Sequence, residues 1–207
     1  MIKEACVLNI LEAINAFKLG ANRIELCENI VCGGTTPSYG TIKILKENLN
    51  IPIVVMIRPR CGNFVYSNLE FQAMKEDIKV CKSLGVEGVV FGILEENNEI
   101  DIARTKELVS LTKPLKATFH KAIDSTCDIR ASVLRLAEIG IHRILTSGGG
   151  LEAKDSLMVL KDLILMAGEK LEIVVAGKVS KDNVDSIDSI LGAKAYHGRL
   201  IVGGLSL

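Results

Sequence analysis

The sequence has no tryptophan and few other aromatic residues, which make up 4% of its 207 residues. Its core must therefore come from the aliphatic side chains that dominate its 48% hydrophobic content. Neither charge sign is in excess, since Lys+Arg and Asp+Glu each number 25. That balance argues against a broad nucleic-acid-binding or anionic-membrane surface. No apolar run is long enough to span a bilayer, and the first residues, MIKEACVLNI, lack the long apolar segment of a secretory signal. We expect a cytoplasmic protein that binds neither nucleic acid nor membrane.

The chain also lacks linker-like segments rich in Pro, Gly or Ser, so residues 1–207 are predicted to form one domain. Its six cysteines include no CxxC pair, and their spacing fits no zinc template. In a cytoplasmic chain of this size, reduced thiols are expected and a disulfide framework is not.

Short apolar runs alternate with longer amphipathic ones along the whole chain, and a motif of helix end, Gly turn and strand recurs in KLGANRIEL, SLGVEGVVF, EIGIHRILT and ILGAKAYHG. This pattern predicts an α/β fold, a (β/α)8 TIM barrel. A doubly wound open sheet is the alternative, but it does not require eight near-equal strands. The predicted strands are Lys3–Val7, Arg23–Cys27, Ile53–Ile57, Gly88–Phe91, Ala117–His120, Arg143–Thr146, Glu172–Ala176 and Ala195–His197.

Only nine residues follow Gly198, so the eighth helix of the barrel is predicted to be missing or vestigial. That would leave part of the outer wall of the barrel uncovered. Because an exposed apolar surface of this kind often marks an interface, we expect a homo-oligomer, a dimer or a larger assembly.

Polar side chains collect at the predicted C-terminal strand ends, where TIM barrels carry their chemistry. Glu4 and Glu25 are predicted to point into the barrel, where they need partners to offset desolvation. Arg58 and Arg60, directly after the third strand, are the expected partners and a candidate anion site. The alternative is an ion-pair network that only closes the barrel.

Two further features extend this anion hypothesis. The loop containing Ser147, Gly148 and Gly149 precedes a predicted helix, where backbone N–H groups bind anions well. His120 can act as an acid or base, with Asp124 and Glu25 nearby. The alternatives are tight turns for the glycines and a structural hydrogen-bonded role for the histidine. Together these residues suggest an enzyme that acts on a small anionic or phosphorylated metabolite at the C-terminal mouth of the barrel.

The cysteines suggest a different chemistry. Cys6 and Cys27 end adjacent predicted strands and can approach each other, and Cu(I) prefers soft thiolates. Cys32 and Cys61 lie in the loops after the second and third strands, where they too could form a site. The alternative is that each cysteine is a small buried hydrophobic side chain.

Several segments resemble the CutC family of copper homeostasis proteins over nearly the whole chain. They are NRIELCENIVCGGTTPSYG (22–40), MIRPRCGNFVYS (56–67), GVVFGIL (88–94), TFHKAID (118–124), RILTSGGG (143–150) and YHGR (196–199). The resemblance implies a cytoplasmic TIM-barrel protein that binds or traffics Cu(I). The residues that match the family pattern are Glu25, Cys27, Arg58, Arg60, His120, Asp124, Ser147, Gly148, Gly149 and His197.

The chain departs from the family pattern at a few positions. Cys61 and Asn63 stand where the family usually has glycine and aspartate, and Lys178 stands where it usually has glycine. Cys32 and Cys61 therefore inherit no copper role from the resemblance. Two hypotheses follow: a Cu(I) protein that uses Cys6 and Cys27, or an enzyme with its site at the barrel mouth.

Overall fold

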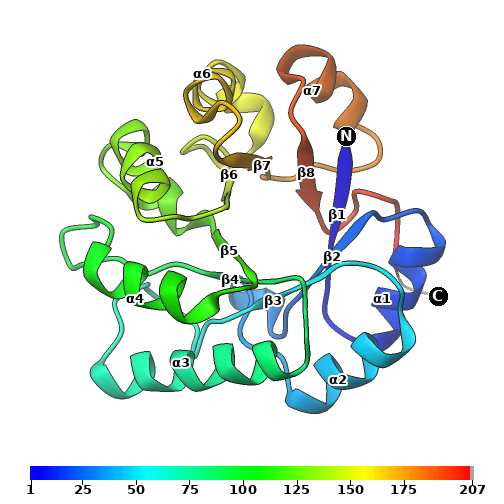
Figure 1. The fold of residues 1–207 in the computed structure, drawn as a ribbon. Helices are drawn as coiled ribbons and strands as arrows, with labels where there is room; N and C mark the ends of the chain where they lie inside the picture. The colour runs from blue at the N-terminus through cyan, green and yellow to red at the C-terminus, as the bar shows by residue number, and fades with distance from the viewer. Residues whose placement is uncertain (206–207) are drawn as a thin grey trace.

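The computed structural model describes residues 1–205, which form a closed barrel of eight parallel strands in chain order (Figure 1). The barrel prediction is confirmed, and the predicted strand boundaries hold to within one residue at each end. The strands are β1 Ile2–Val7, β2 Arg23–Leu26, β3 Ile53–Met56, β4 Gly88–Phe91, β5 Lys116–Phe119, β6 Arg143–Thr146, β7 Glu172–Val175 and β8 Ala195–Gly198.

Seven α-helices surround the barrel: α1 Ile10–Lys18, α2 Tyr39–Asn48, α3 Asn68–Ser83, α4 Ile102–Thr112, α5 Ile129–Glu138, α6 Leu157–Ala167 and α7 Val184–Leu191. Three short 3₁₀ helices follow strands: η1 Ile30–Cys32, η2 Lys121–Ser125 and η3 Ala153–Ser156. Side-chain caps fix several helix starts; Asn9, for example, accepts a hydrogen bond from the Glu12 N–H. Within residues 1–205, no helix has the length and apolar character needed to cross a membrane.

Strand alternation divides the core in two. One set of strand side chains packs under the helices in a large aliphatic cluster, as the composition requires. The other set fills the barrel interior, where two small apolar groups lie apart from that cluster. The first consists of Cys6, Cys27, Val54, Met56 and Val90, and the second of Leu145, Val174, Ala176 and Ala195. Among the other buried strand residues are the ionisable Glu4, Arg23, Glu25 and Arg143.

Arg23 is the central cation of the barrel interior. It is 4% exposed and binds Glu4 through Nε and Glu172 through Nη2, the latter at 3.0 Å. Arg143 lies beside it, 3.6 Å from the same Glu172 carboxylate. The prediction that Arg58 and Arg60 neutralise Glu4 is therefore wrong. The partner of Glu4 is Arg23, the first residue of β2.

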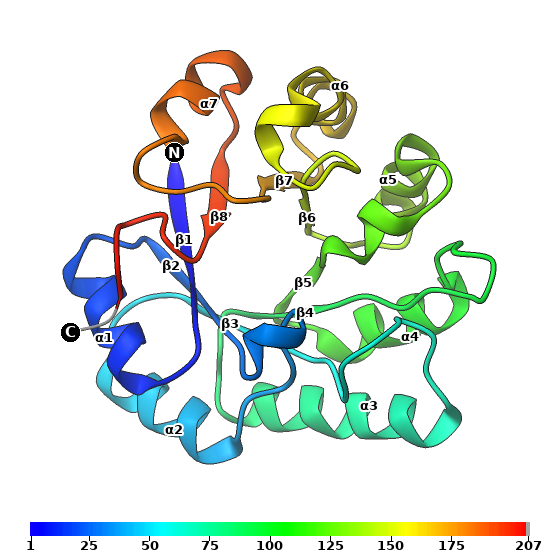
Figure 2. The ribbon, with the colours of Figure 1, turned by 180° about the vertical axis from the view of Figure 1, so that it is seen from behind.

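The chain ends without an eighth helix in the described residues, as predicted. Instead, residues 199–205 run toward α1 (Figures 1 and 2). Ile201, Val202 and Leu205 are buried in the main core, and Arg199 forms an ion pair with Glu12 of α1 at 2.6 Å. This segment covers part of the wall that the missing helix was expected to expose. The homo-oligomer stays a prediction.

We expect Arg23→Ala to lower the free energy of unfolding by about 3 kcal/mol, the lower end of the range for breaking a buried ion pair, because Glu4 keeps His197 and Glu172 keeps Arg143 as partners. Urea denaturation measures this loss. The matched control is Lys79→Ala, which removes an exposed ion pair with Glu76 and should cost less than about 1 kcal/mol. Similar losses in the two variants would contradict a central role for Arg23.

Candidate metal centre

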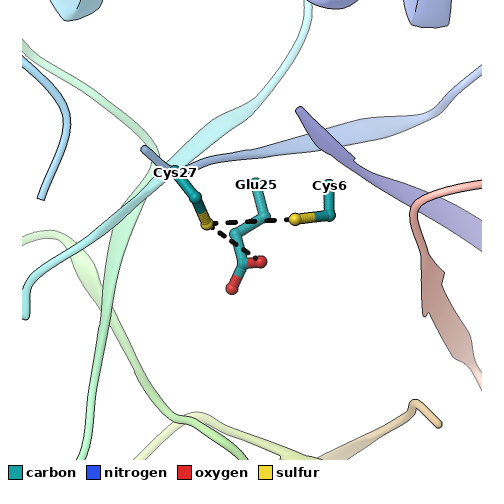
Figure 3. A group of neighbouring side chains, drawn as sticks. All are labelled: Cys6, Glu25 and Cys27. Atoms are coloured by element: carbon teal, nitrogen blue, oxygen red, sulfur yellow. Dashed lines mark hydrogen bonds between the residues drawn. The ribbon is translucent and has the colours of Figure 1, made fainter. Parts of the chain in front are cut away.

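Two thiols and a carboxylate meet inside the barrel at the C-terminal ends of β1 and β2 (Figure 3). Cys6 pairs in register with Glu25 on the neighbouring strand, and Cys27 lies two residues further on the same face. The two Sγ atoms are 3.9 Å apart, and Cys27 Sγ lies 3.4 Å from Glu25 Oε2. All three side chains are at most 3% exposed. The sequence prediction that Cys6 and Cys27 approach each other is confirmed by this geometry.

His197 of β8 connects the two thiols and Glu25 to the ion pair between Glu4 and Arg23. Its Nδ1 lies 2.8 Å from Glu4 Oε1, and its Nε2 lies 3.5 Å from Glu25 Oε2. Glu4 in turn accepts from Arg23. The ring of His197 is therefore held in one orientation by a carboxylate that is itself held by an arginine.

The carboxyl groups of Glu4 and Glu25 are both buried, but their pKa values are shifted in opposite directions. Burial raises the pKa of Glu25 to about 8, and the attraction of His197 only partly offsets this effect. Burial acts in the same direction on Glu4, but hydrogen bonds and charges from His197 and Arg23 lower its pKa to about 2. Burial alone would lower the pKa of His197, yet Glu25, Cys6 and Glu4 raise it well above its usual value. The neighbours of Glu4 and His197 therefore favour their charged forms, while burial favours the neutral form of Glu25.

The two thiols also differ. The hydrogen bond from Cys27 lowers the pKa of Cys6 well below its usual value, against the effect of burial. The same hydrogen bond raises the pKa of Cys27, and burial raises it further. The sulfur pair therefore shares one proton and carries one negative charge near the His197 imidazolium.

A cavity of about 220 Å³ opens above the thiols. Cys6, Glu25, Cys27 and His197 contribute its polar and sulfur-bearing part. The other lining residues are Ile30, Gly33, Met56, Phe64, His120, Lys121, Ala122 and Leu145.

The donor atoms of this group fit a soft metal ion. Those of Cys6, Glu25 and Cys27 lie within 4.8 Å of one another, as do those of Glu4, Glu25 and His197. Glu25 Oε1 is buried and has no hydrogen-bond partner among residues 1–205, so this oxygen can act as a ligand once the carboxyl group loses its proton. Two sulfurs with one oxygen or nitrogen suit a thiophilic cation better than Mg²⁺ or Ca²⁺, which prefer oxygen.

Arg58 is buried, but it points into the loops rather than toward Glu25. Its Nη1 donates to the carbonyl oxygens of Cys32 and Gly34 at 2.8 and 2.9 Å, and its Nη2 donates to that of Gly62 at 2.7 Å. The guanidinium also stacks on Phe64, 4.9 Å from the ring centroid. The predicted pairing of Arg58 with Glu4 or Glu25 is wrong, because backbone carbonyls take its donors.

Arg60 is likewise engaged elsewhere. Its Nε donates to Glu70 at 2.5 Å, and its Nη2 donates to the Val65 carbonyl at 2.7 Å. It therefore joins the loop after β3 to the first turn of α3. Neither arginine pairs with an inward carboxylate in the described part of the chain.

The loop of Ser147, Gly148 and Gly149 donates hydrogen bonds to a carboxylate of the same chain, that of Asp124. Asp124 accepts from the Ser147 N–H at 3.0 Å, the Ser147 hydroxyl at 2.8 Å and the Gly149 N–H at 3.1 Å. The Gly148 N–H donates to Thr146 Oγ1 at 2.9 Å. The donors predicted to hold an external anion are thus already paired, and Asp124 is not among the residues that line the cavity.

His120 lines the cavity but is held as a neutral ring. Its Nδ1 accepts from the Ala122 N–H at 3.1 Å, and its ring lies 4.9 Å from that of Phe64. Burial, with a smaller effect of the Arg58 charge, lowers its pKa to about 3. Its Nε2 is buried without a hydrogen-bond partner in residues 1–205.

Cys32 and Cys61 form a disulfide, with Cα atoms 5.4 Å apart. The prediction that all six cysteines are reduced is wrong for this pair. The two residues are 29 positions apart in two irregular loops, and no periodicity in the sequence indicates that such loops meet.

The neutral state of His120 predicts a pH-dependent stability. Because its pKa is lowered in the folded state, the unfolded chain binds more protons between pH 6.5 and about 3. Wild type should therefore lose its stability advantage over His120→Gln as the pH falls through this range, by at most about 1.4 kcal/mol per pH unit. Urea titrations of both proteins at pH 7, 6, 5 and 4 measure the difference. A constant difference across that range would contradict the prediction.

Comparison with known proteins agrees with this architecture. A sequence model described as the CutC family matches residues 1–202. The human protein named copper homeostasis protein cutC homolog is 39% identical over 196 residues, which are 95% of this chain and 72% of that protein. A family protein CutC from Chromobacterium violaceum is 38% identical over 95% of this chain and 79% of its own length.

Solved structures give the same result. The crystal structure of the putative copper homeostasis protein CutC from Streptococcus agalactiae superposes with a TM-score of 0.92 at 37% identity, covering 97% of this chain and 99% of that one. The aldolase QR15, at 11% identity and a TM-score of 0.67, shares the fold alone. On the family match and these identities, the chain belongs to the CutC family of copper homeostasis proteins.

Proposed function

We propose that this protein binds Cu(I) between the Sγ atoms of Cys6 and Cys27 and thereby takes part in copper homeostasis in the cytoplasm. The observation that carries the proposal is the pair of buried sulfurs 3.9 Å apart beside a carboxylate oxygen without a partner. Metal–thiolate bonds are about 2.3 Å long, so one ion can bridge two sulfurs at this separation with little movement.

The charge of the site favours a monovalent ion. The two sulfurs share one proton in the free protein, and Cu(I) carries the same charge as that proton. Replacing one by the other leaves the buried charge unchanged. A divalent ion such as Zn²⁺ would add a positive charge beside the His197 imidazolium and Arg23, or require further proton loss.

The surroundings of the sulfur pair support the same ion. Met56 places a thioether in the cavity wall, and Ile30, Phe64 and Leu145 make much of that wall apolar. Soft sulfur donors in an apolar site suit Cu(I). His197, held by Glu4 at 2.8 Å, would orient the Glu25 carboxyl that faces the sulfurs.

An enzyme that acts on a small anionic metabolite is less well supported. A cavity does lie at the C-terminal end of the barrel, and Lys121 lines it. However, the donors predicted to bind the anion already have partners. Arg58 donates to backbone carbonyls, Arg60 pairs with Glu70, and the glycine loop donates to Asp124. Of the three proposed catalytic residues, Glu25 and His120 line the cavity and Asp124 does not.

The copper proposal predicts the result of a Cu(I) competition titration against a chelator of known affinity. The protein is used without oxygen, with ascorbate keeping copper reduced and the Cys32–Cys61 disulfide intact. Cys6→Ser and Cys27→Ser should each lower the affinity at least about tenfold, because a thiolate is replaced by a weak ligand. Cys81→Ser, which changes a buried cysteine of α3 outside the site, is the control and should bind as wild type does. Wild-type affinity in both site variants would rule out this pair as the ligand.

A further inference from the structure

The Cys32–Cys61 disulfide joins two loops that contribute other residues to the wall of the cavity. Cys32 ends η1 after β2, and Cys61 lies in the loop after β3. The same two loops contribute Ile30, Gly33 and Phe64 to the cavity lining. Cys61 is exposed and Cys32 is partly exposed, so a reductant can reach this disulfide from solvent, in contrast to the buried Cys6 and Cys27.

The two loops are held together by more than the disulfide. Arg58 binds the carbonyls of Cys32 and Gly34 in one loop and that of Gly62 in the other. Its guanidinium is buried and stacked on Phe64. These charge-assisted hydrogen bonds do not depend on the oxidation state of the sulfurs. After reduction, Arg58 would therefore keep the backbones of Cys32 and Cys61 close to their present Cα separation of 5.4 Å.

The outer cysteines are also close to the inner ones. The backbone of Gly34 packs directly on the inner site: a Cβ there would lie 3.5 Å from Cys27 Sγ and 3.5 Å from Met56 Cε. Gly34, two residues after Cys32 in the chain, thus packs against Cys27. Met56 lines the cavity at this contact, together with Cys6 and Cys27.

We propose that Cys32 and Cys61, when reduced, form a second Cu(I) site beside the cavity, which oxidation to the disulfide switches off. This inference rests on the proposed Cu(I) function and adds an entry site to it. The switch requires a dithiol reductant, which delivers two electrons and two protons to the disulfide and leaves as its own disulfide. Cu(I) then displaces the two thiol protons to solvent and is bound by both sulfurs.

Arg58 preorganises this outer pair. Two thiols on free loops would have to be brought together at an entropic cost when they bind a metal. Here that cost is met in folding by the hydrogen bonds that Arg58 makes to both loops. Cys127 is the contrasting case, an exposed free cysteine with no second cysteine beside it among the described residues.

The test is the Cu(I) stoichiometry of the fully reduced protein, with excess reductant removed under anaerobic conditions. Wild type and the control Cys127→Ser should each bind about two equivalents. The C32S/C61S and C6S/C27S double variants should each bind about one. Oxidised wild type should bind about one, and treatment with a dithiol should restore the second.

The outcomes separate this inference from the proposed function. If reduced wild type binds no more Cu(I) than oxidised wild type or C32S/C61S, the outer site is overturned, whatever the inner site does. If C6S/C27S binds as much Cu(I) as wild type while C32S/C61S loses an equivalent, the inner site fails and the outer one stands. Should C32S/C61S unfold, the comparison of reduced with oxidised wild type still decides the question, because it changes no residue.

Discussion

The hydrogen bond between Glu4 and His197 is the interaction on which the site depends. It joins β1 to β8, the strands that close the barrel, and it fixes the ring that faces Glu25. Arg23 holds Glu4 from the other side, so the carboxylate is bound by two cations inside the barrel. A metal-binding group is only as well placed as the residues behind it. In this protein that support is a line of buried charges, Arg23–Glu4–His197, that ends below the thiols.

The two thiols are not equivalent. The hydrogen bond between them lowers the pKa of Cys6 and raises that of Cys27; the His197 ring adds to the first effect and burial to the second. Burial raises the pKa of Glu25, which disfavours a further negative charge beside them. A negative charge on sulfur is expensive in an apolar cavity unless it is balanced, and a shared proton and the nearby His197 ring provide that balance. A monovalent cation that replaces the proton would keep it.

Much of this could be predicted from sequence, and the failures have physical causes. Strand alternation correctly placed Glu4 with Cys6 and Glu25 with Cys27, because a two-residue period decides which side chains share a face. The same two-residue period places Arg23 on the face of β2 that carries Glu25, and Arg23 is the residue that pairs with Glu4. The prediction chose Arg58 instead, because it directly follows the third strand at the predicted mouth of the barrel. Nothing in the sequence pattern showed that Arg58 turns toward loop carbonyls, since these loops have irregular backbones that no periodicity describes.

The corrections bear on function as well as on geometry. Asp124 occupies the glycine loop, and Lys178, in a left-handed conformation with φ of 56°, forms an ion pair with Glu152 at 2.6 Å. Features that would hold a phosphate in another barrel are here satisfied by side chains of the same chain. An anionic substrate would have to displace these contacts, each of which leaves a polar group unpaired. The sulfur pair faces no such competition, because binding a cation there only replaces a shared proton. These contacts favour the proposed soft cation over an anion as the ligand of the barrel mouth.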